Sequence, residues 1–254
     1  MDLGLGNLNV IITGGTKGIG RRTADLFASE GANVSVCARN ADEVTSAVAS
    51  FADSGVKSFG QAIDVSDKAA LDEWVAESAK ALGGIDIVVA NVSALAAAED
   101  SEDSWNAQFD IDMMHTVRTV NASMSYLEKS EYPSIVIVSS VSGREIDFAS
   151  PAYGAFKAAL IHYSHGLAHK LAPKQIRVNS VSPGNVYFKG GIWNYVEDNM
   201  PDLFKSAMDL NPTGRMATPE EIGKGIVFLA SPASSFTMGT NLVIDGALTK
   251  GVQL

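Results

Sequence analysis

The chain has 254 residues, of which 46% are hydrophobic and 19% charged, and its formal net charge at pH 7 is −10. This apolar content is sufficient for a packed core and excludes an intrinsically disordered protein, and the length fits one large domain or two small ones. The acidic balance argues against a nucleic-acid partner, because binding a phosphate backbone requires clustered Lys and Arg.

Cysteine usage and apolar runs narrow the class of protein further. The single cysteine, Cys37, excludes an intrachain disulfide bond and a zinc site made of cysteines. No apolar run approaches the roughly 20 residues of a membrane span, and we find no signal peptide. We therefore expect a cytoplasmic protein without a membrane partner.

Short runs rich in β-branched residues alternate with longer helical patterns along the chain. Strands are predicted at 8–13, 33–38, 58–63, 85–91, 134–140, 176–182 and 241–244. Helices are predicted at 20–29, 41–52, 68–82, 105–129, 153–171 and 219–229. Most of the strands are continuous apolar runs, which is typical of sheets covered on both faces. With no linker or repeat, the pattern predicts an α/β fold: one Rossmann-type, doubly wound parallel sheet of about seven strands flanked by helices, forming one domain over residues 1–254.

Several helix ends are marked by residues with known capping preferences. Ser66 stands where an N-cap would precede the helix at 68–82, and the pair Gly83-Gly84 follows the end of that helix. Thr218 followed by Pro219 marks the start of the last helix, because proline suits the first helical turn.

The segment 185–216 differs from the rest of the chain. It lies between a strand and a helix and is rich in glycine and aromatic residues, including Tyr187, Phe188, Trp193 and Tyr195. Loops of this length in compact domains are usually functional. We predict a mobile lid here, with at least one aromatic side chain lining a substrate pocket.

A glycine-rich turn joins the first predicted strand to the first helix. Its sequence, Thr13-Gly-Gly-Thr-Lys-Gly-Ile-Gly20, lets the backbone turn sharply and approach a pyrophosphate closely. The N-terminus of the next helix supplies free N–H groups and the positive end of a helix dipole. The spacing differs from the commoner Gly-x-Gly-x-x-Gly, and an ordinary strand-to-helix turn remains an alternative.

Tyr153 and Lys157 lie four residues apart in a predicted helix, so their side chains share one face. A phenol is a poor base near neutral pH, but a nearby ammonium favours the phenolate, which can exchange a proton with an alcohol or a carbonyl. Ser140 ends a strand at the edge where open α/β sheets bind ligands, and its hydroxyl can donate to the same substrate oxygen. Taken alone, such a Tyr–Lys pair is more often found on an ordinary surface.

Together these features resemble the short-chain dehydrogenase/reductase family over nearly the whole chain. Residues 13–20 are similar to its cofactor turn, and Ser140, Tyr153 and Lys157 match its catalytic serine, tyrosine and lysine in identity and spacing. The resemblance implies that Asp64 and Val65 lie against the adenine ring, and that the segment after Ser182 lies under the nicotinamide. The implied cofactor-binding residues are Gly14, Thr16, Lys17, Gly18, Ile19, Arg39, Asp64, Val65, Asn91, Tyr153, Lys157, Pro183, Gly184 and Val186.

Three positions depart from the family pattern. Asp112 stands where the family has a fourth catalytic residue, an Asn that interrupts a helix; Phe188 replaces a Thr that contacts the nicotinamide; and only Asn91 remains of an Asn-Asn-Ala-Gly segment. An anion at Asp112 is expected to raise the pKa of Lys157 and to weaken the support that this cation gives to a tyrosinate. Two alternatives stay open: a protonated Asp112 that imitates Asn, or an ordinary helix residue.

The resemblance also locates the residues that choose between nucleotides. NAD-selective members carry an acid near the end of the second strand, where this chain has Ala38 followed by Arg39. Lys17 adds a second cation, and no carboxylate is expected at that site, so we predict that NADP(H) is favoured over NAD(H). Alternatively, both cations are solvated surface charges.

The resemblance implies an NADP(H)-dependent oxidoreductase that interconverts a secondary alcohol and a ketone. Tyr153 is expected to be the general acid and base, Lys157 its charged partner and ribose contact, and Ser140 the donor to the substrate oxygen, with Asp112 completing the catalytic set. The aromatic lid favours an apolar or cyclic substrate. Two alternatives remain: a 3-oxoacyl-carrier-protein reductase, whose acidic carrier requires a basic patch, and a non-catalytic cofactor-binding sensor, which only Asp112 favours.

Partners and metals follow from the same resemblance. A small-molecule alcohol or ketone is the expected partner, and the family commonly forms homotetramers or homodimers through the helices predicted at 105–129 and 153–171. His162, His165 and His169 share a helix face, but no carboxylate joins them in sequence. We therefore expect no metal site. His115 is expected either to face the cleft or to pack in the core.

Overall fold

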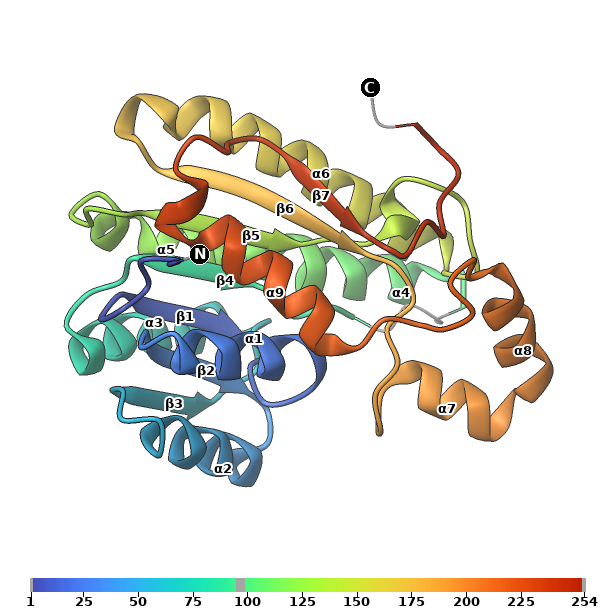
Figure 1. The fold of residues 1–254 in the computed structure, drawn as a ribbon, viewed down its shortest axis with the longest axis horizontal. Helices are drawn as coiled ribbons and strands as arrows, with labels where there is room; N and C mark the ends of the chain where they lie inside the picture. Colours follow the sequence, from blue (N-terminus) through green and yellow to red (C-terminus); the bar gives the residue numbers. More distant parts are fainter. Residues whose placement is uncertain (1, 95–98, 253–254) are drawn as a thin grey trace.

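A computed structural model of the chain describes residues 2–94 and 99–252. Within these residues, seven strands form one parallel sheet in the order β3-β2-β1-β4-β5-β6-β7 (Figure 1). The strands are β1 (Asn9–Thr13), β2 (Asn33–Ala38), β3 (Ser58–Ala62), β4 (Ile87–Ala90), β5 (Ser134–Val138), β6 (Arg177–Pro183) and β7 (Asn241–Ile244). The predicted fold class is confirmed.

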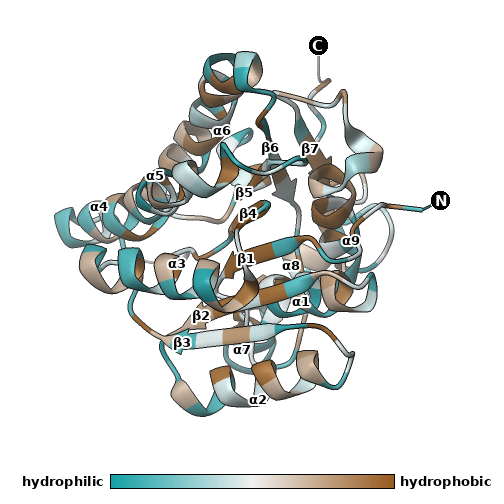
Figure 2. Ribbon diagram, turned by 90° about the vertical axis from the view of Figure 1, so that its left-hand side faces the viewer, coloured by the Kyte–Doolittle hydropathy of each residue, from teal (hydrophilic) through white to brown (hydrophobic). Residues whose placement is uncertain are grey.

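Helices cover both faces of the sheet. They are α1 (Gly18–Ser29), α2 (Ala41–Ala52), α3 (Lys68–Leu82), α4 (Glu102–Gln108), α5 (His115–Leu127), α6 (Pro151–Leu171), α7 (Ile192–Asn199), α8 (Pro201–Leu210) and α9 (Pro219–Ala230). One buried apolar cluster joins the sheet to α1 and α9, and a second joins it to α3, α5 and α6. The central strands β4, β5 and β6 are buried along their whole length. This explains the largely apolar sequences of β4 and β5 (Figure 2). None of the described helices is both long and apolar enough to cross a membrane.

The strand order reverses between β1 and β4. The chain runs outwards from β1 through β2 to β3, then returns to pair β4 with the other side of β1. The loops that follow β1 and β4 therefore leave the sheet in opposite directions and open a crevice at its carboxyl edge. This crevice is where open α/β sheets bind ligands, and the predicted site residues follow the strand ends around it.

Two predicted boundaries need correction. The N-cap of α3 is Asp67, whose Oδ1 accepts hydrogen bonds from the backbone N–H groups of Ala69 and Ala70, so the expected cap at Ser66 is wrong. The Ser66 hydroxyl instead donates to Asp64. The helix predicted at 105–129 consists of α4, a π-helical segment η1 (Phe109–Met114), and α5. The start of α9 at Thr218 is confirmed by a reciprocal capping box with Glu221.

The expectation of a long loop at 185–216 is wrong, because the segment contains α7 and α8. Ile192–Asn199 carries no glycine or proline, and Ile192 and Val196 lie one turn apart on its inner face. Pro201 occupies the first turn of α8, a position that proline favours. The two helices stand at the carboxyl edge of the sheet, beside the crevice (Figure 1). The mobility of this segment stays a prediction.

Candidate active site

A cavity of about 270 Å³ opens at the carboxyl edge of the sheet. Three of the predicted catalytic residues, Ser140, Tyr153 and Lys157, line it, and Asp112 contacts Lys157 from behind. Five predicted cofactor residues share the lining: Ile19, Asn91, Pro183, Gly184 and Val186. The cavity thus brings together side chains that are more than 100 residues apart in sequence.

The start of α6 positions the Tyr153–Lys157 pair. The Ser150 hydroxyl caps this helix by accepting a hydrogen bond from the backbone N–H of Tyr153 at 3.4 Å, and Pro151 fills the first turn. One turn later, the Nζ of Lys157 lies 5.4 Å from the centre of the Tyr153 ring. Lys157 also donates to the backbone carbonyl of Val138 at 3.2 Å, which holds the ammonium at the end of β5.

Asp112 forms a buried ion pair with Lys157, with 2.8 Å between Oδ1 and Nζ. Its carboxylate also accepts hydrogen bonds from the Ser93 hydroxyl at 2.7 Å and the Ala94 N–H at 2.9 Å. Burial alone would lower the pKa of Lys157, but the charge of Asp112, the charge of Tyr153 and the hydrogen bond to Asp112 together outweigh it, so that pKa is raised. Because Asp112 contacts the predicted catalytic lysine directly, the alternative of an ordinary helix residue is wrong.

The π-helical turn explains how Asp112 reaches this position. Within η1, the backbone N–H of His115 donates to the carbonyl of Asp110, five residues back, instead of continuing the α-helical pattern. The wider turn leaves Asp112 fully buried while Asp110 stays exposed. Single π-turns within α-helices frequently mark functional sites.

Ser140 belongs to a chain of polar groups that the sequence reasoning missed. Its hydroxyl donates to Ser142 Oγ at 3.1 Å, and Ser142 in turn donates to Asp147 Oδ2 at 2.6 Å. The Ala149 N–H donates to the other oxygen of Asp147. Ser142 and Asp147 both line the cavity. The short spacing of Ser142 from Ser140 is a signal that the sequence offers, whereas nothing in the sequence points to Asp147.

The glycine turn leaves the N-terminus of α1 open. Gly14 and Gly18 have φ values of +68° and +53°, which are strained for other residues. Lys17, at the N-cap of α1, provides no side-chain cap, and the first turn contains no acidic residue. By contrast, Asn40 and Asp67 cap α2 and α3 with their side chains. The exposed N–H groups and the helix dipole fit the pyrophosphate of a dinucleotide.

Asn91 ties the end of β4 to this turn. Its side-chain Nδ2 donates to the backbone carbonyl of Thr13 at 3.0 Å, and its backbone N–H donates to Thr13 Oγ1 at 2.9 Å. Asn185 also lines the cavity, and its side-chain Nδ2 is buried without a hydrogen-bond partner among the described residues. A buried amide donor without a partner fits a ligand that brings an acceptor, as a dinucleotide does.

The outer end of the site contains a carboxylate that we did not expect. Lys17 Nζ lies 2.6 Å from Glu43 Oε1, and the Thr16 hydroxyl donates to the same carboxylate at 3.2 Å. The hydrogen bond from Lys17 lowers the pKa of Glu43. We predicted that no carboxylate lies beside Lys17 and Arg39, and for Lys17 this prediction is wrong. The reason is that α2 follows β2 so closely that its first turn faces the glycine turn.

The remaining predicted nucleotide residues follow β2 and β3. Hydrogen bonds from the backbone and hydroxyl of Ser66, and to a smaller extent the charge of Arg39, lower the pKa of Asp64. Arg39 and Asp64 are therefore close enough to interact, and Val65 beside them is buried. This group lies on the β2–β3 side of the crevice, outside the cavity that contains Tyr153.

Aromatic side chains from 185–216 close the cavity on the lid side. Phe188 and Trp193 line it, which confirms the prediction of an aromatic lining, whereas Tyr195 is 59% exposed. Phe188 packs directly on the glycine turn: a Cβ atom added to Gly18 would lie 2.6 Å from the end of its ring. Trp193 meets Phe148 edge-on, with ring centres 6.3 Å apart.

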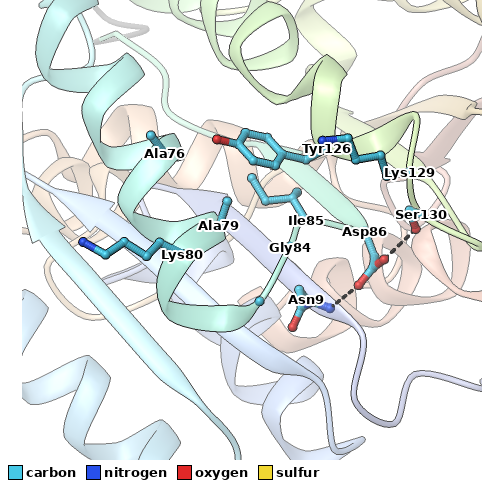
Figure 3. A pocket seen from close by; sticks show the side chains of 11 residues that line it. Asn9, Ala76, Ala79, Lys80, Gly84, Ile85, Asp86, Tyr126, Lys129 and Ser130 are labelled. Atoms are coloured by element: carbon cyan, nitrogen blue, oxygen red, sulfur yellow. Dashed lines mark hydrogen bonds between the residues drawn. The ribbon is translucent and has the colours of Figure 1, made fainter.

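A second hollow, of about 430 Å³, lies at the opposite, amino edge of the sheet (Figure 3). Asp86 accepts hydrogen bonds there from the backbone N–H of Asn9 at 2.7 Å and from the Ser130 hydroxyl at 2.5 Å. These bonds join the loops before β1, β4 and β5. We assign this hollow a structural role, because its carboxylate is already paired with those loops and none of the predicted site residues lines it.

The histidines do not form a metal site in the part of the chain that the structure describes. No group of three or more His, Cys, Asp or Glu side chains there is arranged to hold an ion. His162, His165 and His169 are exposed on α6, whereas His115 is buried in the core beside the Asp112–Lys157 pair.

Comparisons with known proteins agree with this arrangement. A family model described as enoyl-(acyl carrier protein) reductase matches residues 14–249. Isoepoxydon dehydrogenase of Penicillium expansum is 41% identical over 100% of this chain and 99% of its own length. The 3-oxoacyl-[acyl-carrier-protein] reductase of Chlamydia muridarum is 32% identical over 95% of this chain and 97% of its own length. Among solved structures, L-sorbose reductase of Gluconobacter frateurii, complexed with NADPH and L-sorbose, matches with a TM-score of 0.91 at 27% identity, covering 99% of this chain and 100% of that one.

Proposed function

The chain belongs to the short-chain dehydrogenase/reductase family of oxidoreductases, and from this we propose that it interconverts a secondary alcohol and a ketone, with NADP(H) favoured over NAD(H). The observation that carries the proposal is the shared cavity, in which Ser140, Tyr153 and Lys157 meet the residues expected beside a nicotinamide. The relative solved with NADPH supports the choice of nucleotide.

The residues expected to hold the nucleotide form a continuous path. The first-turn N–H groups of α1, from Gly18 to Gly20, bind the pyrophosphate, and Lys17 and Arg39 bind the 2′-phosphate. Asp64 and Val65 lie at the adenine end, while Gly184 and Val186 lie at the nicotinamide end, where Asn185 offers its unpaired amide. NADPH supplies the hydride.

Proton transfer belongs to the residues of the chain. In reduction, Tyr153 donates its phenolic proton to the ketone oxygen, while the Ser140 hydroxyl turns away from Ser142 and donates its hydrogen bond to the same oxygen. The Lys157 ammonium stabilises the phenolate that remains, and it is itself kept charged by Asp112. In oxidation, the phenolate takes the proton from the alcohol. Asp112 therefore supports the charge of Lys157 and, at the same time, partly offsets its effect on the phenolate.

The lining of the cavity supports a small, uncharged substrate. Phe148, Phe188 and Trp193 provide apolar walls, and apart from Lys157 the only charged side chain among the lining residues is Asp147. Because an acidic carrier protein needs cations at the entrance, this lining argues against a carrier-linked acyl substrate. The 32% identical 3-oxoacyl reductase makes that activity the second candidate.

A reduction assay separates the candidates. Consumption of NADPH is followed with a cyclic ketone, a ketose and a carrier-linked 3-oxoacyl thioester, for the wild type and Tyr153→Phe. We expect the wild type to reduce the cyclic ketone, and the variant to be slower by about 10²–10⁴-fold with nearly unchanged NADPH affinity. Turnover of only the thioester would favour the second candidate. NADPH binding without turnover in any class would favour a non-catalytic sensor, and near-normal turnover by Tyr153→Phe would reject its role.

A further inference from the structure

His115 is a buried titratable residue for which the proposed reaction has no use. It begins α5, one turn after Asp112, and only 1% of its surface is exposed. Its Nδ1 contacts the backbone carbonyl of Ile111, and its Nε2 lies 3.2 Å from Thr13 Oγ1. Thr13 ends β1 and directly precedes the glycine turn. The imidazole therefore lies between the catalytic π-turn and the turn expected to hold the cofactor.

The contacts of His115 fix its protonation state. A carbonyl oxygen can only accept, so Nδ1 must carry the proton that it donates to Ile111. In the neutral ring Nε2 is then an acceptor, and the Thr13 hydroxyl donates to it. This leaves the lone pairs of Thr13 Oγ1 free to accept from the backbone N–H of Asn91, as observed at 2.9 Å. Each of these polar groups has a partner only while His115 is the Nδ1–H tautomer.

We propose that His115 is a positioning residue: as the neutral Nδ1–H tautomer, it connects the π-turn that carries Asp112 to Thr13 and so fixes the glycine turn relative to Lys157. This inference rests on the proposed cofactor site at that turn. Asn91 completes the connection, since it binds Thr13 through both its backbone and its side chain. The substrate-side pair and the nucleotide-side turn are thus held together by one ring.

The surroundings of His115 favour the neutral ring. Burial lowers its pKa to about 4, and Lys157 on α6 acts in the same direction. The Ile111 carbonyl and the Asp112 carboxylate on η1 oppose the shift with a smaller effect. Protonation would point an N–H from Nε2 at Thr13, and the Thr13 hydroxyl would lose its acceptor.

Nitrogen NMR tests the tautomer directly. The chain has four histidines, so the triple variant His162→Gln/His165→Gln/His169→Gln leaves His115 alone, and the three substituted side chains are exposed. We expect ¹⁵N shifts of a neutral ring protonated at Nδ1, unchanged from about pH 8 down to about pH 5. A ring protonated at Nε2, or one that titrates near its ordinary pKa, would overturn the proposal.

Nucleotide titrations test the positioning role. We expect His115→Leu and Thr13→Val each to weaken NADPH binding about tenfold, because each leaves a buried polar group unpaired. The double variant should lose little more than either single one, whereas Thr13→Ser, which keeps the hydroxyl, should stay within about twofold of wild type. His162→Leu on the exposed face of α6 is the matched control and should bind normally.

The outcomes separate this inference from the proposed function. Unchanged NADPH affinity in a folded His115→Leu, or losses that simply add in the double variant, would contradict the positioning role while leaving the enzyme assignment intact. A wild type that binds neither NADPH nor NADH contradicts both. If His115→Leu does not fold, the comparison of Thr13→Val with Thr13→Ser and the tautomer measurement decide.

Discussion

At the scale of single residues, the buried pair of Asp112 and Lys157 has the largest consequence for chemistry. A carboxylate paired at 2.8 Å with the ammonium that we propose as catalytic favours its protonated form, since it raises the pKa of Lys157 against the effect of burial. The negative charge of Asp112 also offsets part of the electrostatic stabilisation that Lys157 gives to a phenolate at Tyr153. Lys157 therefore stays charged, but its effect on the phenol of Tyr153 is reduced.

Replacing Asp112 with Asn tests this balance. Asn has nearly the same shape, and its oxygen can still accept the bonds from Ser93 or Ala94. Without the anion, the pKa of Lys157 falls and its remaining charge acts fully on Tyr153, so the phenolate is favoured at lower pH. We expect the pH–rate profile of alcohol oxidation to move towards lower pH, as measured by initial rates. An unmoved profile with unchanged rates would reject Asp112 as a tuning residue.

We expect Glu43 to compete with a 2′-phosphate for Lys17. The two side chains form an ion pair at 2.6 Å, and a phosphate beside Lys17 has to share that cation with the carboxylate. We expect Glu43→Gln to tighten NADPH binding by about two- to fivefold, a modest effect because the pair is partly exposed to solvent and screened, and to leave NADH binding unchanged. Fluorescence titration with both nucleotides measures this. Glu77→Gln, which frees Lys80 on α3, is the control; equal tightening for NADH would contradict the assignment.

At the scale of elements, regular segments were predictable and irregular ones were not. The bounds of β2, α2, α3 and β7 match those predicted from apolar runs and helical periodicity. β2, α2 and α3 each bury a regular set of residues. The π-turn at η1 is different: its extra residue is stabilised by contacts with Lys157 and Ser93 that are distant in sequence. Likewise, α7 and α8 were missed because glycine and aromatic content masked a short helical pattern.

In the candidate site, too, residues with regular local spacing were predictable from the sequence, and contacts between loops were not. Ser140, Tyr153 and Lys157 have fixed spacings within or between neighbouring elements, so the sequence shows them. The Lys17–Glu43 pair and the Ser142–Asp147 contact depend on how loops fold towards one another, which no local pattern encodes. Whether His115 faced the cleft or packed in the core was also left open, since its contact with Thr13 spans 102 residues.

His115, at the junction of η1 and α5, is expected to make the free energy of unfolding depend on pH. Its pKa is lowered to about 4 in the folded chain from an ordinary value of 6.5. The unfolded chain therefore binds more protons between these values, and the stability present above about pH 6.5 falls by about 3 kcal/mol as the pH drops to about 4. Chemical denaturation at several pH values measures the slope. We expect a shallower slope for His115→Gln, and an identical slope would contradict this origin.

At the scale of the whole molecule, we propose that exposed aromatic side chains on α4 and η1 form a surface for self-association. Trp105 and Phe109 are 39% and 46% exposed, and their rings meet Phe156 of α6 at 6.0 and 6.1 Å between centres. They belong to the two helical regions that we propose as the contact of a homotetramer or homodimer. Apolar side chains gathered in one exposed cluster are typical of such contacts.

Polar substitutions on this surface test the assembly. We expect Trp105→Ser/Phe109→Ser to reduce the mass measured by light scattering from the wild-type oligomer to a smaller species, since the contact loses its apolar centre. Leu210→Ser changes an equally exposed apolar side chain on α8 and should leave the mass unchanged. A wild-type monomer, or a variant with the wild-type mass, would reject this surface as the contact.

The position of Phe188 has a consequence for the order of events in time. Its ring rests on Gly18, at the turn where we propose that the pyrophosphate binds. We expect a nucleotide that binds at this turn to displace the ring, so that its arrival is governed by a step within the protein and not by collision alone. The same ring also lines the cavity beside Tyr153. We therefore expect its displacement by the first ligand to reshape the space into which the second ligand must fit, and so to impose an order of entry on the two ligands.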